Sequence, residues 1–228
     1  MREVLVLCEG QTEREFCRSV VAPKIVHSGI ALKGTLVGKP HRKRGGIRDW
    51  PVYRKELLRL AKERSDRHVG VLVDYYGMPR NWPGRASSNE VPIVQRGLQV
   101  EEALQDDLNS ELGDRFHPCV QLHEFESLLF VDPNIAVRSI ALDGGITYYQ
   151  RIAEQMEQVK CEFEGHIEAI NDSPESAPSK RLKKIMPGYD KVAWGVTAAK
   201  DITLEVLRNE CSWLNRWLTK LETQGEDW

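Results

Sequence analysis

The sequence predicts an α/β protein with a mainly parallel central sheet, followed by a helical region. Two observations support this prediction. Through residue 132, short apolar runs alternate with segments in which apolar residues recur at helical spacing, whereas from about Pro133 onward the pattern is mostly helical. We therefore expect a core at 1–132 and a helical region at 133–228 that packs on it.

The expected strands of the core are short and largely apolar. They lie at 3–8, 30–37, 69–73 and 117–122. The run at 69–73 is almost continuously apolar, as expected for a central strand that is covered on both faces.

Helices are expected between these strands. The first begins at Thr12, where Thr12 and Glu15 fit a capping box, and ends before Pro23. The others are predicted at 49–64 and 97–112, with loops at 39–48 and 75–96.

The second part of the chain contains mainly helical patterns. Helices are predicted at 148–159, at 185–200 with an interruption at Pro187 and Gly188, and at 203–221. A polar loop is expected at 171–179.

Composition excludes several classes of protein. The 228 residues carry a formal net charge of -2, so any nucleic-acid surface must be local. The five cysteines lack C-x-x-C spacing, which argues against a disulfide framework or a structural zinc site. No signal peptide or membrane-spanning run is visible, and we expect a soluble protein of the cytoplasm.

Acidic residues follow three of the expected strands. Glu9 and Glu13 follow the first, Asp74 the third, and Glu124 and Glu126 the fourth. The carboxyl ends of parallel strands face a common crevice, so these side chains can converge there. Oxygen ligands suit Mg²⁺ or Mn²⁺, and the pattern predicts one divalent-metal site.

Two of these acidic residues also have simpler interpretations. Glu13 alone would equally well be a favourable charge on the first helical turn, and Asp74 alone could form a turn. Glu9 is harder to explain in this way, because a carboxylate at the end of a buried strand needs a partner. His123, which directly precedes Glu124, is better explained as a structural histidine than as a metal ligand.

Basic residues gather in two places where they could contact phosphates. Segments of this kind are most often solvated surface, and the loop at 39–48 is as consistent with solvent as with nucleic acid. The candidates are Arg42, Lys43 and Arg44 in that loop, and Lys180, Arg181, Lys183, Lys184 and Lys191 in the helical region.

Five segments together resemble the bacterial family called domain of unknown function 4276, which is similar to Toprim domains. They run in order through almost the whole chain. They are 4–13 (VLVLCEGQTE), 74–79 (DYYGMP), 123–130 (HEFESLLF), 177–181 (APSKR) and 187–191 (PGYDK).

The resemblance implies a Toprim-like, Rossmann-like core and roles for individual residues. The Toprim glutamate matches Glu9, the additional acidic residue of the nuclease branch matches Glu13, and the first aspartate of the Asp-x-Asp motif matches Asp74. The second aspartate is replaced by Tyr76, so a second metal is in question, unless Glu124 or Glu126 supplies the ligand.

The resemblance further implies a catalytic lysine, and either Lys180, beside Arg181, or Lys191 could fill this role. The family is similar to the Toprim nuclease domain of the overcoming-lysogenization-defect (OLD) family. We therefore expect a Mg²⁺-dependent nuclease that acts on DNA or RNA in anti-phage defence, with an AAA- or ABC-type ATPase as a possible partner. The alternative is a non-catalytic subunit that binds nucleic acid or a partner protein.

Overall fold

The computed structural model describes residues 1–38, 44–122, 124–140, 145–170 and 176–223. The chain forms two compact units. The first comprises 1–122 together with the segment from Trp213 onward, and the second comprises 123–212.

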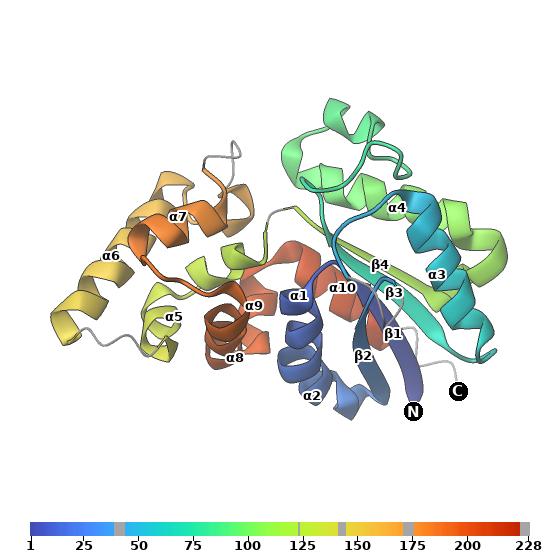
Figure 1. Cartoon of the computed structure of the whole chain (residues 1–228), viewed down its shortest axis with the longest axis horizontal. Coiled ribbons are helices and arrows are strands. Elements are labelled where there is room, and N and C mark those ends of the chain that lie inside the picture. The colour runs from blue at the N-terminus through green and yellow to red at the C-terminus, as the bar shows by residue number, and fades with distance from the viewer. Residues whose placement is uncertain (39–43, 123, 141–144, 171–175, 224–228) are drawn as a thin grey trace. The chain divides into compact units, whose positions relative to one another are not determined.

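The first unit contains a four-stranded parallel sheet with the order β2-β1-β3-β4 (Figure 1). The strands are β1 (Arg2–Cys8), β2 (Ile30–Leu36), β3 (His68–Asp74) and β4 (Phe116–Gln121). β1 and β3 are central neighbours, with Cys8 opposite Leu72. Because all four strands are parallel, their carboxyl ends lie at the same edge.

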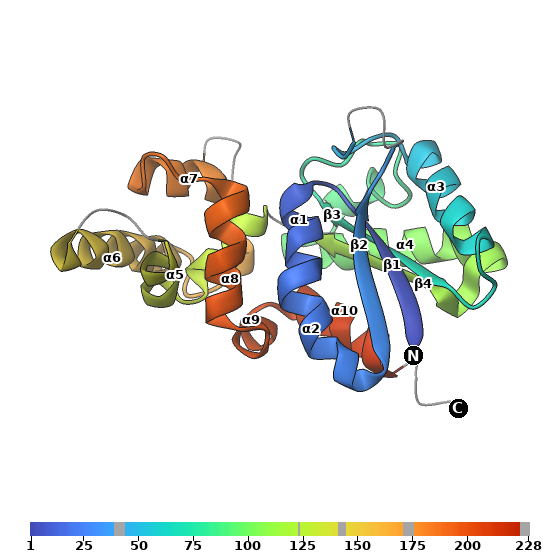
Figure 2. The ribbon, with the colours of Figure 1, turned by 60° about the horizontal axis from the view of Figure 1, so that its bottom comes forward.

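Helices connect successive strands and cover both faces of this sheet. Figure 2 shows α1 and α2 on one side and α3 on the other. The helices of the first unit are α1 (Gln11–Phe16), which continues through a π-type segment (Cys17–Val21) into α2 (Ala22–Ile25), and α3 (Trp50–Lys62), α4 (Ile93–Leu112) and α10 (Ser212–Thr223).

Strand β1 is apolar on both sides because both faces are covered. Leu5 and Leu7 belong to the same buried cluster as Leu57 of α3 and Leu104 of α4. The alternate residues of the strand point to the opposite face and are also buried. There α1 lies close to β2, since a Cβ at Gly34 would come within 3.1 Å of the Arg14 backbone.

The edge strand β4 is closed by side chains from two helices. The buried carboxylate of Glu101 on α4 accepts a hydrogen bond from the Val120 N–H at 2.9 Å. Arg216 of α10 makes an ion pair with the same carboxylate at 3.2 Å. These contacts satisfy an edge N–H group and attach α10 to the first unit.

The second unit is helical. Its elements are a 3-10 segment (Phe125–Phe130), α5 (Pro133–Ser139), α6 (Ile146–Glu162), α7 (Pro178–Ile185), a π-type segment (Lys191–Gly195), α8 (Val196–Ile202) and α9 (Leu204–Glu210). The apolar faces of α6 and α8 supply much of its core, including Ile152, Met156, Ala198 and Ile202.

The predicted α/β class with a parallel sheet is confirmed. The compact units differ from the expected boundary at residue 132, because the segment after β4 lies in the helical unit and α10 lies in the first. The single helix expected at 203–221 was wrong, since the chain breaks at Cys211 between α9 and α10.

All five cysteines are free thiols. Among the described residues, none of the helices combines the length and apolar character that crossing a membrane requires.

Candidate metal centre

Glu9 and Asp74 meet at the carboxyl ends of the two central strands. The Glu9 backbone N–H donates to the Leu72 carbonyl at 3.1 Å, which continues the β1–β3 pairing by one residue. The Asp74 backbone N–H donates to Oε2 of Glu9 at 3.2 Å. The carboxylate of Glu9 is therefore held against the end of β3, where the Asp74 side chain begins.

Glu13 reaches the same edge from the first turn of α1. Only 4% of Glu13 is exposed. Its carboxylate lies over Gly10, because a Cβ at residue 10 would come within 2.8 Å of Oε2 of Glu13. The glycine thus leaves room for a buried carboxylate directly after Glu9.

The predicted capping box was wrong. Helix α1 begins at Gln11, so Gly10 is its N-cap and Thr12 lies within the first turn. Gly10 also leaves the space that the Glu13 side chain occupies, and Glu15 instead bonds Arg18 on the exposed face of the helix.

Glu9 and Glu13 act electrostatically on the same buried neighbour. Tyr53 of α3 is buried, and burial raises the pKa of its phenol. The Glu9 carboxylate raises this pKa further, and Glu13 acts in the same direction. Burial likewise raises the pKa of the Cys8 thiol, with a contribution from Glu13. The two carboxylates therefore create a negative region at the end of β1.

The loop after β2 packs against the backbone of Glu9. The Gly46 N–H donates to the Glu9 carbonyl at 2.7 Å, and the Arg44 guanidinium donates to the Leu36 carbonyl at 2.7 Å. Arg44 thus contacts the end of β2. Arg42 and Lys43 lie outside the described residues.

The turn after β3 carries one buried and one exposed aromatic ring. Tyr75 is buried, its hydroxyl lies 2.8 Å from Oγ of Ser88, and the Arg85 guanidinium lies 4.0 Å from its ring centroid. Tyr76, which was expected from the resemblance to replace a second aspartate, is 43% exposed and meets Tyr75 edge-on. This position therefore offers a phenol instead of a carboxylate.

The donor chemistry of this edge suits a hard cation. Mg²⁺ is commonly bound through only one or two carboxylates, with waters completing its shell, and Glu9, Glu13 and Asp74 provide such oxygens. No three His, Cys, Asp or Glu side chains within the described ranges form a ready set of metal ligands. A cation here would accordingly rely on few protein ligands and on bound water.

A second acidic group lies in the helical unit. Glu126 is 1% exposed and forms an ion pair with Nζ of Lys191 at 3.1 Å. Burial raises the pKa of Glu126; Lys191 opposes this rise, and Glu124 adds to it. The backbone N–H of Ser179, in the first turn of α7, donates to Oε2 of Glu124 at 2.9 Å. The expectation that Glu124 or Glu126 shares a cation with Glu9 stays a prediction.

Tyr189 belongs to this second group, and the sequence analysis did not identify it as a site residue. Its ring is buried, and burial followed by the Glu126 charge raises the pKa of its phenol, with Asp190 and Glu124 acting in the same direction. Asp190 itself caps the next segment by accepting from the Ala193 N–H at 2.7 Å.

The basic residues of α7 separate into different environments. Arg181 forms an ion pair with Glu162 of α6 at 2.9 Å. Lys180, Lys183 and Lys184 are exposed. Of the two lysines that the resemblance allows, only Lys191 has an ion pair with a predicted site carboxylate among the described residues.

A protein-family model described as Domain of unknown function (DUF4276) matches residues 8–222. Two solved structures align over nearly the whole chain. The C-terminal region of the Burkholderia pseudomallei OLD protein has 15% identity and a TM-score of 0.46, covering 98% of both chains. That of the Xanthomonas campestris pv. campestris OLD protein has 14% identity and a TM-score of 0.46, covering 98% of this chain and 96% of that one. No curated protein matches.

Proposed function

The chain belongs to the family Domain of unknown function (DUF4276), and we propose that it is a metal-dependent nuclease that hydrolyses phosphodiester bonds of DNA or RNA. The observation that carries this proposal is the position of Glu9. Its carboxylate lies just after one central strand and accepts a hydrogen bond from the Asp74 N–H at the end of the next, and the buried Glu13 follows in the first turn of α1.

In this proposal Glu9, Asp74 and Glu13 hold Mg²⁺ or Mn²⁺ partly through bound water, because these described side chains do not form a ready set of three direct ligands. When bound, the cation would lower the pKa of a water and offset negative charge on a phosphate. The Asp74 N–H fixes the orientation of the Glu9 carboxylate, and Gly10 keeps the Glu13 carboxylate at the same edge. Preorganised oxygens of this kind reduce the reorganisation needed when a cation and substrate bind.

Between the two candidate lysines, the contacts favour Lys191. A lysine that pairs with a buried carboxylate has a fixed position, whereas Lys180 is an exposed side chain. We expect Lys191→Met to lower kcat more than Lys180→Met does, because a fixed charge is better placed to act in the transition state.

The proposed setting is anti-phage defence beside an ATPase of the AAA or ABC type, which is the context that the resemblance to OLD-type nucleases implies.

A second candidate function is a subunit that binds nucleic acid or a partner protein without cleaving. The phenol of Tyr76 in place of a second aspartate favours it. This alternative predicts metal-independent binding and no hydrolysis.

Cleavage of labelled single-stranded DNA, duplex DNA and RNA, with Mg²⁺, with Mn²⁺ and with EDTA, separates the two functions. The wild type should cleave at least one substrate with metal only, and Glu9→Gln should lower the rate by at least about a hundredfold, the scale expected when a fixed catalytic electrostatic group is lost. Glu15→Gln is the matched control, because it makes the same change on α1 at a partly exposed carboxylate that pairs with Arg18. Equal rates for Glu9→Gln and Glu15→Gln would contradict the proposal.

A further inference from the structure

A hollow of about 450 Å³ lies between α6 and α7, and basic side chains outnumber acidic ones among the described residues of its wall. Lys180, Arg181 and Lys184 line it from α7, and Glu162 of α6 is the one carboxylate that the described part of its wall contains. The volume lies in the range of ligand sites, roughly 300–1,000 Å³. We propose that this hollow binds a backbone phosphate of the nucleic acid, which rests on the proposed function and adds to it a substrate-holding site.

Arg181 is held in place before any ligand binds. Its Nε donates to the Ser176 carbonyl at 2.9 Å, and its Nη1 contacts Glu162 at 2.9 Å. Its guanidinium also lies 5.2 Å from the ring centroid of Phe163. These contacts use only part of its five N–H donors, and a fixed guanidinium with donors to spare suits a phosphate oxygen.

Lys180 and Lys184 are one helical turn apart on the same face of α7. Like charges at this spacing repel each other and destabilise a helix. In the part of the chain that the structure describes, neither lysine forms an ion pair with a carboxylate. A phosphate bound beside Lys180 and Lys184 would therefore reduce the repulsion between their two positive charges.

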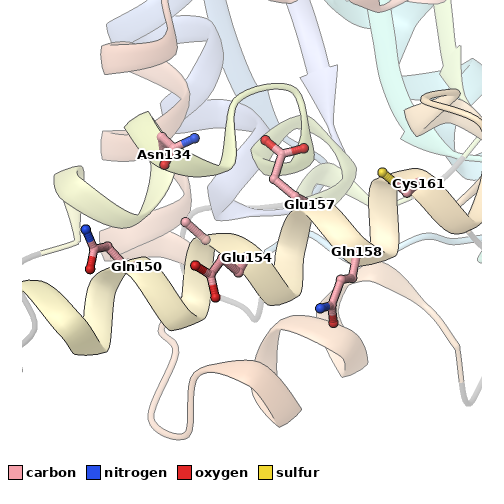
Figure 3. A pocket seen from close by; sticks show the side chains of 7 residues that line it. Asn134, Gln150, Glu154, Glu157, Gln158 and Cys161 are labelled. Atoms are coloured by element: carbon pink, nitrogen blue, oxygen red, sulfur yellow. The ribbon is translucent and has the colours of Figure 1, made fainter.

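The neighbouring hollow on α6 has the opposite character. It measures about 440 Å³, and Figure 3 shows Glu154 and Glu157 among the side chains that line it. The described residues of its wall include no lysine or arginine. The two hollows are similar in size and both border α6, but the charges of their lining residues have opposite signs. Of the two, the hollow beside α7 is the one suited to an anion.

The phosphate could come from a nucleic-acid strand or from a free nucleotide. Beside its charged groups, the hollow is lined by Gln155 and Gln158 and by the aliphatic side chains of Val159 and Ile185, and none of the described residues of its wall is aromatic. Such a lining offers no aromatic ring on which a base could stack, whereas a backbone phosphate needs only charge and hydrogen-bond donors. We therefore assign the hollow to the strand.

The test is salt-dependent binding of fluorescent single-stranded DNA and RNA to the full-length protein in EDTA, measured by anisotropy. Lys180→Gln/Lys184→Gln is compared with Lys62→Gln/Lys200→Gln, which changes the net charge equally at exposed lysines outside the hollow. Losing two phosphate contacts should reduce the slope of log K against log salt by about 1.4. Between roughly 50 and 200 mM salt, the affinity of the hollow variant should then fall about sevenfold less than that of the wild type.

The same slope in both double variants would overturn the assignment. Inorganic phosphate and AMP serve as competitors; if AMP binding depends on Lys180 and Lys184 while oligonucleotide binding does not, the site is one for free nucleotides and the proposal is wrong. Cleavage is assayed separately with Mg²⁺. A changed salt slope without cleavage would refute the nuclease but support the hollow, and cleavage with an unchanged slope would do the reverse.

Discussion

Lowering the pH from 7 to 5 should destabilise the first unit through a buried pair of histidines. Nδ1 of His68 on β3 lies 2.8 Å from Nε2 of His117 on β4, and the rings are stacked. His117 is 3% exposed, and burial, followed by the charge of His68, lowers its pKa to about 3. Burial, followed by the charge of Arg2, lowers the pKa of His68 to about 4.

The sign of the effect follows from the unfolded chain, in which a histidine has a pKa near 6.5. Above that pH the histidine is neutral in both the folded and the unfolded state, so it does not change the free energy of unfolding. Below it the unfolded state binds a proton that the folded state does not, so the free energy of unfolding falls with pH. For His117 alone the loss is about 2 kcal/mol at pH 5, and the half-buried His68 adds a smaller amount.

The assay is urea unfolding at pH 7 and pH 5 for the wild type, His117→Asn and His27→Asn. His117→Asn removes the titrating group, so its loss between the two pH values should be smaller than that of the wild type by about 2 kcal/mol. His27→Asn makes the same change at an exposed histidine. If His117→Asn and the wild type lose equal free energy of unfolding between pH 7 and pH 5, the two histidines do not cause the destabilisation.

Three further substitutions test individual contacts. Gly10→Ala should displace the Glu13 carboxylate and weaken Mn²⁺ binding by roughly tenfold in a calorimetric titration, and unchanged affinity would mean that Glu13 holds no metal. Lys191→Met should reduce the free energy of unfolding by about 1–3 kcal/mol at pH 8, because it leaves the buried Glu126 carboxylate without its cation. The loss should be smaller at pH 5, where the Glu126 carboxyl can take up a proton. An equal loss at both pH values would refute this role of the ion pair. Arg216→Met should cost about 3 kcal/mol in urea unfolding, because it leaves a buried glutamate of α4 without its cation, and a loss below 1 kcal/mol would contradict this.

The sheet could be predicted because its signals are local. A strand covered on both faces must be apolar at successive positions, and the runs before Glu9 and Asp74 have this pattern. Adjacent parallel strands then bring these two strand ends together, which the hydrogen bond between Asp74 N–H and Glu9 reflects.

Other features depend on contacts between residues far apart in sequence. The ion pair of Glu126 with Lys191 and the attachment of α10 through Arg216 are set by packing, which helical periodicity does not specify. The capping prediction failed for a different reason. Thr12 matched a local motif, but glycine also serves as an N-cap, and here it makes room for Glu13.

The most direct test of the metal centre is anomalous diffraction from crystals of the protein grown with Mn²⁺. The account predicts an anomalous peak roughly 2.0–2.6 Å from carboxylate oxygens of Glu9 and Asp74, and its loss in Glu9→Gln crystals. The same map would show whether Glu124 or Glu126 is also a ligand. A peak only at the acidic hollow of Glu154 and Glu157, or none near Glu9 at saturating Mn²⁺, would contradict the assignment.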